Sequence, residues 1–139
     1  MTLPAHRPKR TLRAETITLA HGAGGNAAIW YNQLAFFGDR YLCVAFDHRG
    51  FARSPCTGGA ITVREFRDDL LAIMDALQID KAHLVGQSMG GFTALRTTLD
   101  YPDRILSLTL SCTSGGIVNP NPTPAMQNLT RATGSDPSG

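Results

Sequence analysis

The sequence has no long hydrophobic run: no stretch of 18 apolar residues occurs in its 139 residues, and no apolar segment lies near its start. It therefore predicts neither a membrane-spanning helix nor a secretory signal. Cysteine is also scarce, since Cys43, Cys56 and Cys112 are the only three and none shows C-x-x-C spacing. Neither a disulfide framework nor a structural zinc site is expected, and the sequence favours a cytoplasmic protein. No pattern of metal-ligand spacing is present, so we expect no metal or other cofactor.

The sequence also lacks a large excess of either charge. Its net charge is +2, with 42% hydrophobic and 17% charged residues, which is typical of one globular domain. Arg7, Lys9, Arg10 and Arg13 gather four positive charges at the start, without interleaved aromatic residues. We interpret residues 1–13 as a flexible basic tail, and expect neither a nucleic acid nor a membrane as partner.

Strand-like runs alternate with helix-like patterns, which predicts an α/β fold with a mostly parallel sheet and crossover helices. The expected strands are 15–20, 41–46, 82–85 and 105–110, and the expected helices are 27–37, 63–77 and 89–99. Thr62 and Glu65 fit a capping box at the start of the second helix. We assign residues 14–112 to the α/β domain, and residues 113–139 to a polar tail or the start of a missing cap, because Gly, Pro, Asn and Ser dominate there.

Residues 86–90 read G-Q-S-M-G and lie between an expected strand and an expected helix. This is the G-x-S-x-G nucleophile elbow, a sharp turn that presents the Ser88 hydroxyl at the top of a sheet. Gly86 and Gly90 have a steric explanation, because a Cβ at either position would clash with the neighbouring strand or helix.

Two further motifs follow the first two expected strands. They read H-G-A-G-G-N over residues 21–26 and D-H-R-G-F-A-R-S over residues 47–54. The carboxyl ends of parallel strands meet at one edge of a sheet, where ligand sites form in open α/β sheets.

Taken in order, the three motifs resemble the H-G-x-x-G, D-x-R-G-x-G-x-S and G-x-S-x-G-G motifs of the α/β-hydrolase fold family, in its broad group of esterases, lactonases and C–C hydrolases. The resemblance covers residues 15 to about 112, the N-terminal half of such a domain. Ala52 stands where glycine is usual, which we expect to tighten the turn without affecting the chemistry.

The resemblance implies a serine hydrolase that acts on a small ester, lactone or related carbonyl substrate. Ser88 would attack the carbonyl carbon, an acyl-enzyme would form, and water would release it. The backbone N–H groups of Ala23 and Met89 would form the oxyanion hole.

Supporting roles are implied for other residues of the motifs. His21 would orient the loop that contains Gly22, and Asp47 and Arg49 would tie down the backbone of a turn. His48 is a further candidate, since it lies beside Asp47 at the top of a strand, but the motif there resembles a structural turn.

No histidine follows Ser88, and the only acids after it are Asp100, Asp103 and Asp136. A serine hydroxyl needs a base that is itself oriented by a carboxylate, and in the family both follow later strands. We therefore expect this chain to be a truncated portion of a larger hydrolase and to be inactive or nearly so alone.

The resemblance also predicts the strand order second, first, third, fourth. Strands 41–46 and 105–110 would then have exposed edges through which the chain could associate. Two alternatives stay open: a non-catalytic ligand-binding protein of the same fold, or half of a split enzyme whose second chain supplies the acid and the histidine. The motifs specify neither the substrate nor the oligomeric state.

Overall fold

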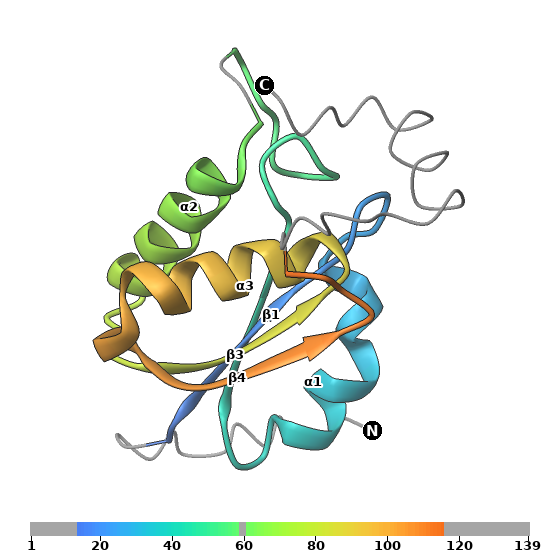
Figure 1. Ribbon diagram of the computed structural model, residues 1–139. Coiled ribbons are helices and arrows are strands. Elements are labelled where there is room, and N and C mark those ends of the chain that lie inside the picture. The colour runs from blue at the N-terminus through green and yellow to red at the C-terminus, as the bar shows by residue number, and fades with distance from the viewer. Residues whose placement is uncertain (1–13, 59–60, 116–139) are drawn as a thin grey trace, which may run out of the picture.

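The computed structural model describes residues 14–58 and 61–115 (Figure 1). The interpretation of residues 1–13 as a basic tail lies outside the described residues, as does that of residues 116–139.

Four parallel strands form the sheet, as the alternating pattern predicts. They are β1 (Thr16–Ala20), β2 (Leu42–Phe46), β3 (Ala82–Gln87) and β4 (Ile105–Ser111). Their order is β2-β1-β3-β4, and every pairing is parallel. The fold class and the expected strand order are thereby confirmed. Because all the strands run the same way, their carboxyl ends and the loops that follow meet at one edge.

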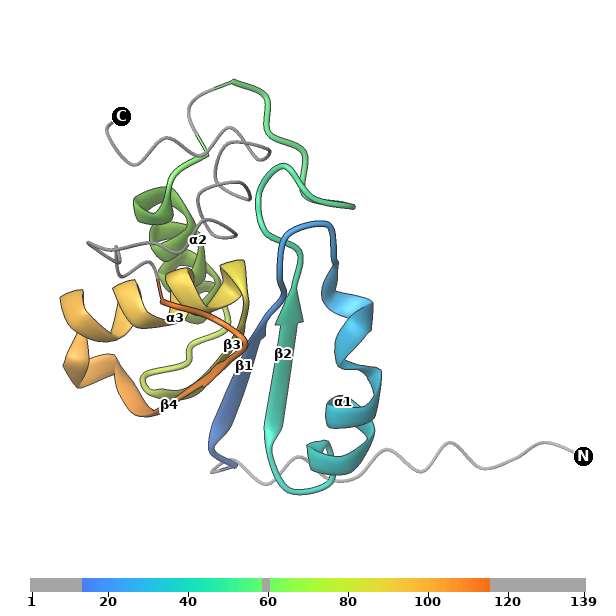
Figure 2. The same ribbon diagram turned by 45° about the vertical axis from the view of Figure 1, so that its right-hand side comes forward.

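Helices cover the sheet unevenly (Figure 2). The helical elements are η1 (Ala27–Trp30), α1 (Tyr31–Phe37), α2 (Val63–Ala76), α3 (Met89–Asp100) and η2 (Pro102–Arg104). One face of the sheet is covered by α2 and α3, and the other by η1 and α1. The capping box at α2 is confirmed, since the Thr62 N–H donates to Glu65 Oε2 at 2.7 Å and the Glu65 N–H donates to Thr62 Oγ1 at 3.4 Å.

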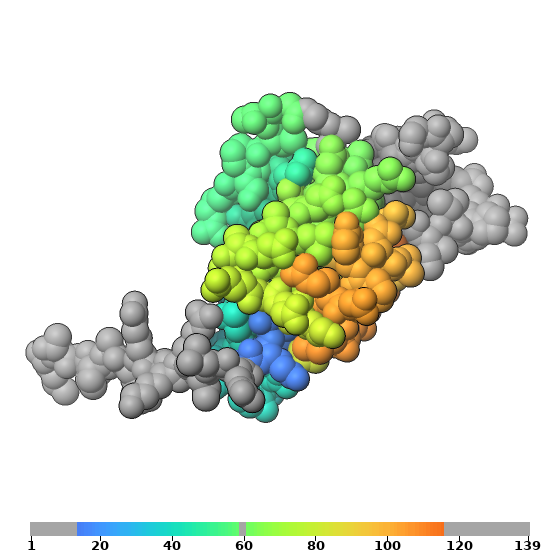
Figure 3. Space-filling model, turned by 90° about the vertical axis from the view of Figure 1, so that its left-hand side faces the viewer, coloured from blue at the N-terminus to red at the C-terminus, as the bar shows by residue number. Residues whose placement is uncertain are grey.

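The larger part of the core lies under α2 and α3. Leu70 and Met74 of α2 and Ala94 of α3 pack there against Phe46 and Leu84 of the sheet. Figure 3 shows this helical face, where α2 runs alongside α3 and η2. The Arg67 guanidinium pairs with Asp100, and Arg104 Nη2 lies 2.8 Å from Asp75 Oδ1. These ion pairs join α2 to the end of α3 and to η2.

The opposite face has a smaller core, in which Ile17 and Leu19 of β1 pack against Trp30. At β4 the cover is thinnest, and Leu106 and Leu110 keep 43% and 41% of their surface exposed. Within the described ranges β4 is an edge strand, as expected. No helix in these ranges combines the length and the apolar character that crossing a membrane requires.

Candidate active site

Ser88 occupies the turn between β3 and α3 in a conformation that L-residues rarely adopt. Its φ is 51° and its ψ is −117°. The backbone is held there from both sides, because the Ser88 N–H donates to the Ser111 carbonyl at 2.9 Å and the Ser88 carbonyl accepts from the Gly91 N–H at 2.9 Å. A strained non-glycine residue at the carboxyl edge of a parallel sheet is typical of a functional site.

The glycines around Ser88 allow close backbone contacts. A Cβ on Gly86 would lie 2.7 Å from the Gly91 Cα, and a Cβ on Gly90 would lie 2.8 Å from the His21 carbonyl oxygen. The predicted steric reason for both glycines is therefore confirmed. The contact of Gly90 also places the first turn of α3, and with it the Met89 N–H, against the end of β1.

The glycine-rich loop after β1 lies beside the elbow. A Cβ built on Gly22 would come within 3.0 Å of Ser88 Cβ, and the Gly25 N–H closes the loop by donating to the Gly22 carbonyl at 3.1 Å. Ala23 is exposed within this loop. The structure thus brings together Ser88, Met89 and the loop that carries Ala23, as the motif spacing predicts.

Asp47 connects this loop to the loop after β2. Its carboxylate accepts from the Ala27 N–H at 2.6 Å and from the Arg53 N–H and Nε at 3.3 Å and 3.1 Å. The bond from Ala27, followed by those from Arg53, holds the pKa of Asp47 below its usual value against the opposing effect of burial. Asp47 ties down backbone as expected, but part of that backbone is the start of η1, which directly follows the first loop.

Arg49 binds a side chain rather than the backbone. Its guanidinium forms a bidentate pair with the Asp69 carboxylate of α2, at 2.6 Å and 2.5 Å. This pairing raises the pKa of Arg49. Ala52 has a φ of 43°, a left-handed conformation that explains why glycine suits this turn.

His21 and His48 are fully buried next to each other, with ring centroids 4.7 Å apart. His21 Nδ1 donates to the Gly22 carbonyl at 2.7 Å, and its Nε2 accepts from the His48 N–H at 3.1 Å. His48 Nε2 lies 2.9 Å from Thr93 Oγ1. Burial, aided by the neighbouring His21, lowers the pKa of His48 to about 4.

His83 is the second residue of β3 and lies at the opposite end of the strand from Ser88. Its Nδ1 lies 2.7 Å from Ser107 Oγ and its Nε2 lies 3.2 Å from Glu15 Oε2. Within residues 14–58 and 61–115, then, no histidine forms a hydrogen bond with Ser88, and no group of three or more potential metal-ligating residues is found.

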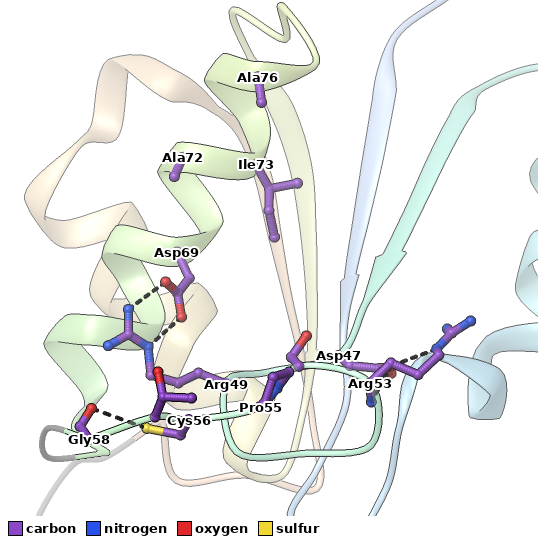
Figure 4. A pocket seen from close by; sticks show the side chains of 12 residues that line it. Asp47, Arg49, Arg53, Pro55, Cys56, Gly58, Asp69, Ala72, Ile73 and Ala76 are labelled. Atoms are coloured by element: carbon purple, nitrogen blue, oxygen red, sulfur yellow. Dashed lines mark hydrogen bonds and ion pairs between the residues drawn. The ribbon is translucent and has the colours of Figure 1, made fainter.

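The described cavities lie away from the elbow. One of about 680 Å³ is bounded by the loop 53–58 and by Ala72, Ile73 and Ala76 of α2, with the Arg49–Asp69 pair inside it (Figure 4). Another, of about 490 Å³, lies between the start of α2 and the Leu95–Leu99 face of α3. Ser88 lines neither of them.

The contact between His48 and Thr93 was not predicted from the sequence. The motif that contains His48 indicates a turn, and Thr93 falls inside an expected helix. The available signal was a pair of threonines four residues apart, Thr93 and Thr97, which lie on the same helical face and are both fully buried.

Comparison with known proteins identifies the architecture. A family model described as alpha/beta hydrolase fold matches residues 15–138. "Putative carbamate hydrolase RutD" of Caulobacter segnis is 38% identical over 98 residues, which cover 69% of this chain and 37% of that protein. The 3-oxoadipate enol-lactonase 2 of Acinetobacter baylyi is 27% identical over 150 residues, covering 97% of this chain and 56% of the lactonase.

Solved structures of hydrolases show a similar fold. The enol-lactonase of Burkholderia xenovorans LB400 superposes with a TM-score of 0.73 at 28% identity, covering 87% of this chain and 50% of that one. An N-acyl homoserine lactone degrading enzyme gives 0.70 at 33% identity, covering 73% of this chain and 39% of that one. The chain therefore spans only about two-fifths to just over half of the length of these relatives.

Proposed function

The chain belongs to the alpha/beta hydrolase fold family, and we propose that Ser88 is the nucleophile of a serine hydrolase acting on small ester, lactone or related carbonyl substrates. The observation that carries this proposal is the backbone of Ser88, held at φ 51° with the glycine-rich loop packed against it. An ordinary strand-to-helix turn requires neither feature.

The substrate class rests on chemistry that the named relatives share. Their names describe a carbamate hydrolase, enol-lactonases and a lactone-degrading enzyme. Carbamates and lactones each contain a carbonyl carbon bonded to an oxygen atom. The proposed pair of backbone N–H groups, those of Ala23 and Met89, suits that carbonyl, because such N–H groups stabilise the negative oxygen of the tetrahedral intermediate.

The reaction would proceed in two stages. The Ser88 oxygen forms a bond to the carbonyl carbon while its proton passes to a base, which then protonates the departing oxygen as the acyl–oxygen bond breaks. Water repeats these steps and releases the acid. The N–H groups of Ala23 and Met89 would bind the carbonyl oxygen throughout.

The base would come from outside the described residues. Both nitrogens of His21 and of His83 have partners, and His48 Nε2 is engaged by Thr93. Buried deeply and with a pKa of about 4, His48 is also a weak base. We therefore propose that the 139-residue chain alone has negligible turnover.

The test compares this chain with the polypeptide encoded by the complete open reading frame. Hydrolysis of p-nitrophenyl acetate and of a simple lactone is measured for both, together with covalent labelling by an alkyl fluorophosphonate. We expect Ser88→Ala to abolish turnover and labelling of the complete polypeptide. Ser114→Ala, an exposed serine near the end of the described residues, serves as the matched control.

Other outcomes separate the alternatives. Turnover by the complete polypeptide that survives Ser88→Ala contradicts the nucleophile assignment. A lactone that binds the native and Ser88→Ala polypeptides equally, without turnover, indicates a non-catalytic binding protein. If the open reading frame ends at Gly139, turnover that appears only on adding a second polypeptide indicates a split enzyme.

A further inference from the structure

A chain of buried polar contacts runs from the glycine-rich loop to α3. His21, His48 and Thr93 keep no more than 1% of their surface exposed. The Gly22 carbonyl accepts from His21 Nδ1, His21 Nε2 accepts from the His48 N–H, and His48 Nε2 meets Thr93 Oγ1. The neighbours His21 and Gly22 are thereby joined in series to His48, 27 positions after His21, and to Thr93, 45 positions after His48.

The direction of the last contact follows from hydrogen-bond accounting. Among the residues that the structure describes, His48 Nδ1 has no hydrogen-bond partner, and it is buried. A buried N–H group that lacks an acceptor is rarer and more costly than a bare ring lone pair among aromatic edges. The proton therefore belongs on Nε2, which donates to Thr93 Oγ1. Phe46 and Phe66 pack around the ring, with centroids 5.0 Å and 4.7 Å away, so it has little room to move.

The two ends of the loop are held by different anchors. Asp47 holds the far end through the Ala27 N–H. At the near end, the Gly22 carbonyl accepts from His21 Nδ1. The other ring nitrogen of His21, Nε2, accepts from the His48 N–H. Among the described side-chain hydrogen bonds, the contact of His48 with Thr93 is the one that joins this end of the site to α3.

We propose that His48 and Thr93 are positioning residues, which fix the loop that carries the Ala23 N–H relative to the α3 turn that carries the Met89 N–H. This inference rests on the proposed function, because only a site that binds an oxyanion needs these two N–H groups at a fixed separation. Displacing such donors by about 1 Å costs on the order of a hundredfold in rate.

Thr93→Val in the polypeptide encoded by the complete open reading frame tests the proposal, because it removes the Oγ1 acceptor and keeps the side-chain shape. Thr97→Val is the matched control: Thr97 is equally buried on the same helix, and its hydroxyl donates only to the Thr93 carbonyl at 2.8 Å. We expect Thr93→Val to lower kcat about tenfold or more with KM nearly unchanged. Thr97→Val should keep kcat within about twofold, and Thr93→Ser should restore it.

Amide hydrogen exchange provides a readout that does not depend on turnover. We expect the Gly25 N–H group, which donates to the Gly22 carbonyl, to exchange at least about fivefold faster in Thr93→Val than in Thr97→Val. Equal kcat and equal exchange in the two variants would overturn the proposal. Turnover that survives Ser88→Ala overturns the proposed function instead, and the exchange comparison still decides whether the loop is anchored through Thr93.

A second pair of variants applies if Thr93→Val does not fold. His48→Gln keeps an N–H donor near the Nε2 position, whereas His48→Leu removes it at similar size. We expect loop exchange to be slower, and kcat about tenfold higher, in His48→Gln than in His48→Leu. Identical behaviour of these two variants contradicts the proposal.

Discussion

Gly22 lies directly against Ser88, so that a Cβ on Gly22 would stand 3.0 Å from Ser88 Cβ and 2.5 Å from Gln87 Oε1. The two residues are 66 positions apart in the sequence. They meet because β1 and β3 are adjacent and parallel, with Ala20 in register with Gly86. Because β1 and β3 pair in parallel, the glycine-rich loop after β1 and the elbow after β3 lie side by side. Gly22 has no side chain, so the two can come into contact.

Gly22→Ala should impair turnover more than stability. The Gln87 side chain can move away from an added methyl group, but Ser88 Cβ is fixed by its backbone, so the loop must retreat by a few tenths of an ångström. We expect kcat of the complete polypeptide to fall about tenfold or more. Gly22→Ala combined with Gln87→Ala is the control, since it removes the side-chain contact only. Full recovery of kcat in the double variant contradicts the role of the Ser88 contact.

Gly90→Ala should impair folding itself. Its Cβ would meet the Ala20 carbonyl carbon at 2.5 Å and the His21 carbonyl oxygen at 2.8 Å, both of them backbone atoms within the sheet and its loop. We expect a loss of about 3 kcal/mol in the free energy of unfolding, measured by urea denaturation. Gly58→Ala is the comparison: its φ is 105°, and a Cβ added there would meet no heavy atom of the described residues within 4 Å, so the variant carries only the backbone cost. Equal losses in the two variants would show that packing at Gly90 is unimportant.

The sequence predicts the strands and helices of this fold to within two residues at most boundaries, and the reason is physical. Apolar runs such as the one ending at Phe46 are too short for helices, and the capping box at Thr62 determines where α2 begins. The elbow and the first loop are also local features of the sequence, because the spacing of their glycines identifies them. The strand order came from the family resemblance, because nothing in a single strand specifies its neighbour.

The connections between the loops were harder to predict. Asp47 forms a hydrogen bond with Ala27, and Arg49 forms one with Asp69; the partners are 20 positions apart in the sequence in each case. A local motif indicates that such side chains are engaged, but their partners depend on how β2 and α2 are placed. The same holds for His48 and Thr93, whose pairing requires α3 to lie close to the loop that follows β2.

The stability of the protein should decrease as the pH falls below about 6.5, because His48 is buried in its neutral form. Burial and the nearby His21 lower its pKa from 6.5 to about 4, and Asp69 and Asp47 oppose this shift only in part. Between these values the unfolded chain binds the proton and the folded chain does not, so stability rises with pH and is lost on acidification. The loss attributable to His48 is about 2 kcal/mol at about pH 5.

The pH measurement is urea unfolding from about pH 7.5 to about pH 4.5, with His48→Gln as reference. The native protein should lose more stability over this interval than the variant. Asp47, whose pKa is lowered from 3.8, contributes stability that is lost only below this interval. Parallel pH profiles for the two proteins would show that His48 is protonated as readily in the folded state as in the unfolded one.

The 139-residue chain should associate through β4. Natural edge strands resist pairing by means of charged residues, proline or bulges that twist the edge away, yet β4 reads I-L-S-L-T-L-S and contains neither charge nor proline. One register shift occurs where it pairs with β3, near Ala82, and the remainder is regular. Leu106 adds an apolar side chain that is 43% exposed, so an edge-to-edge contact would satisfy backbone groups and bury hydrocarbon together.

Leu106→Lys should weaken this association about tenfold, since a lysine on the edge must be desolvated when another strand pairs with it. Leu77→Lys is the matched control: Leu77 is 47% exposed at the end of α2 and belongs to no strand. Sedimentation velocity over a range of concentrations measures both variants beside the native chain. A native chain that stays monomeric would show that the edge of β4 is protected. An equal effect of the two substitutions would show that any exposed leucine, rather than the strand edge, drives the association.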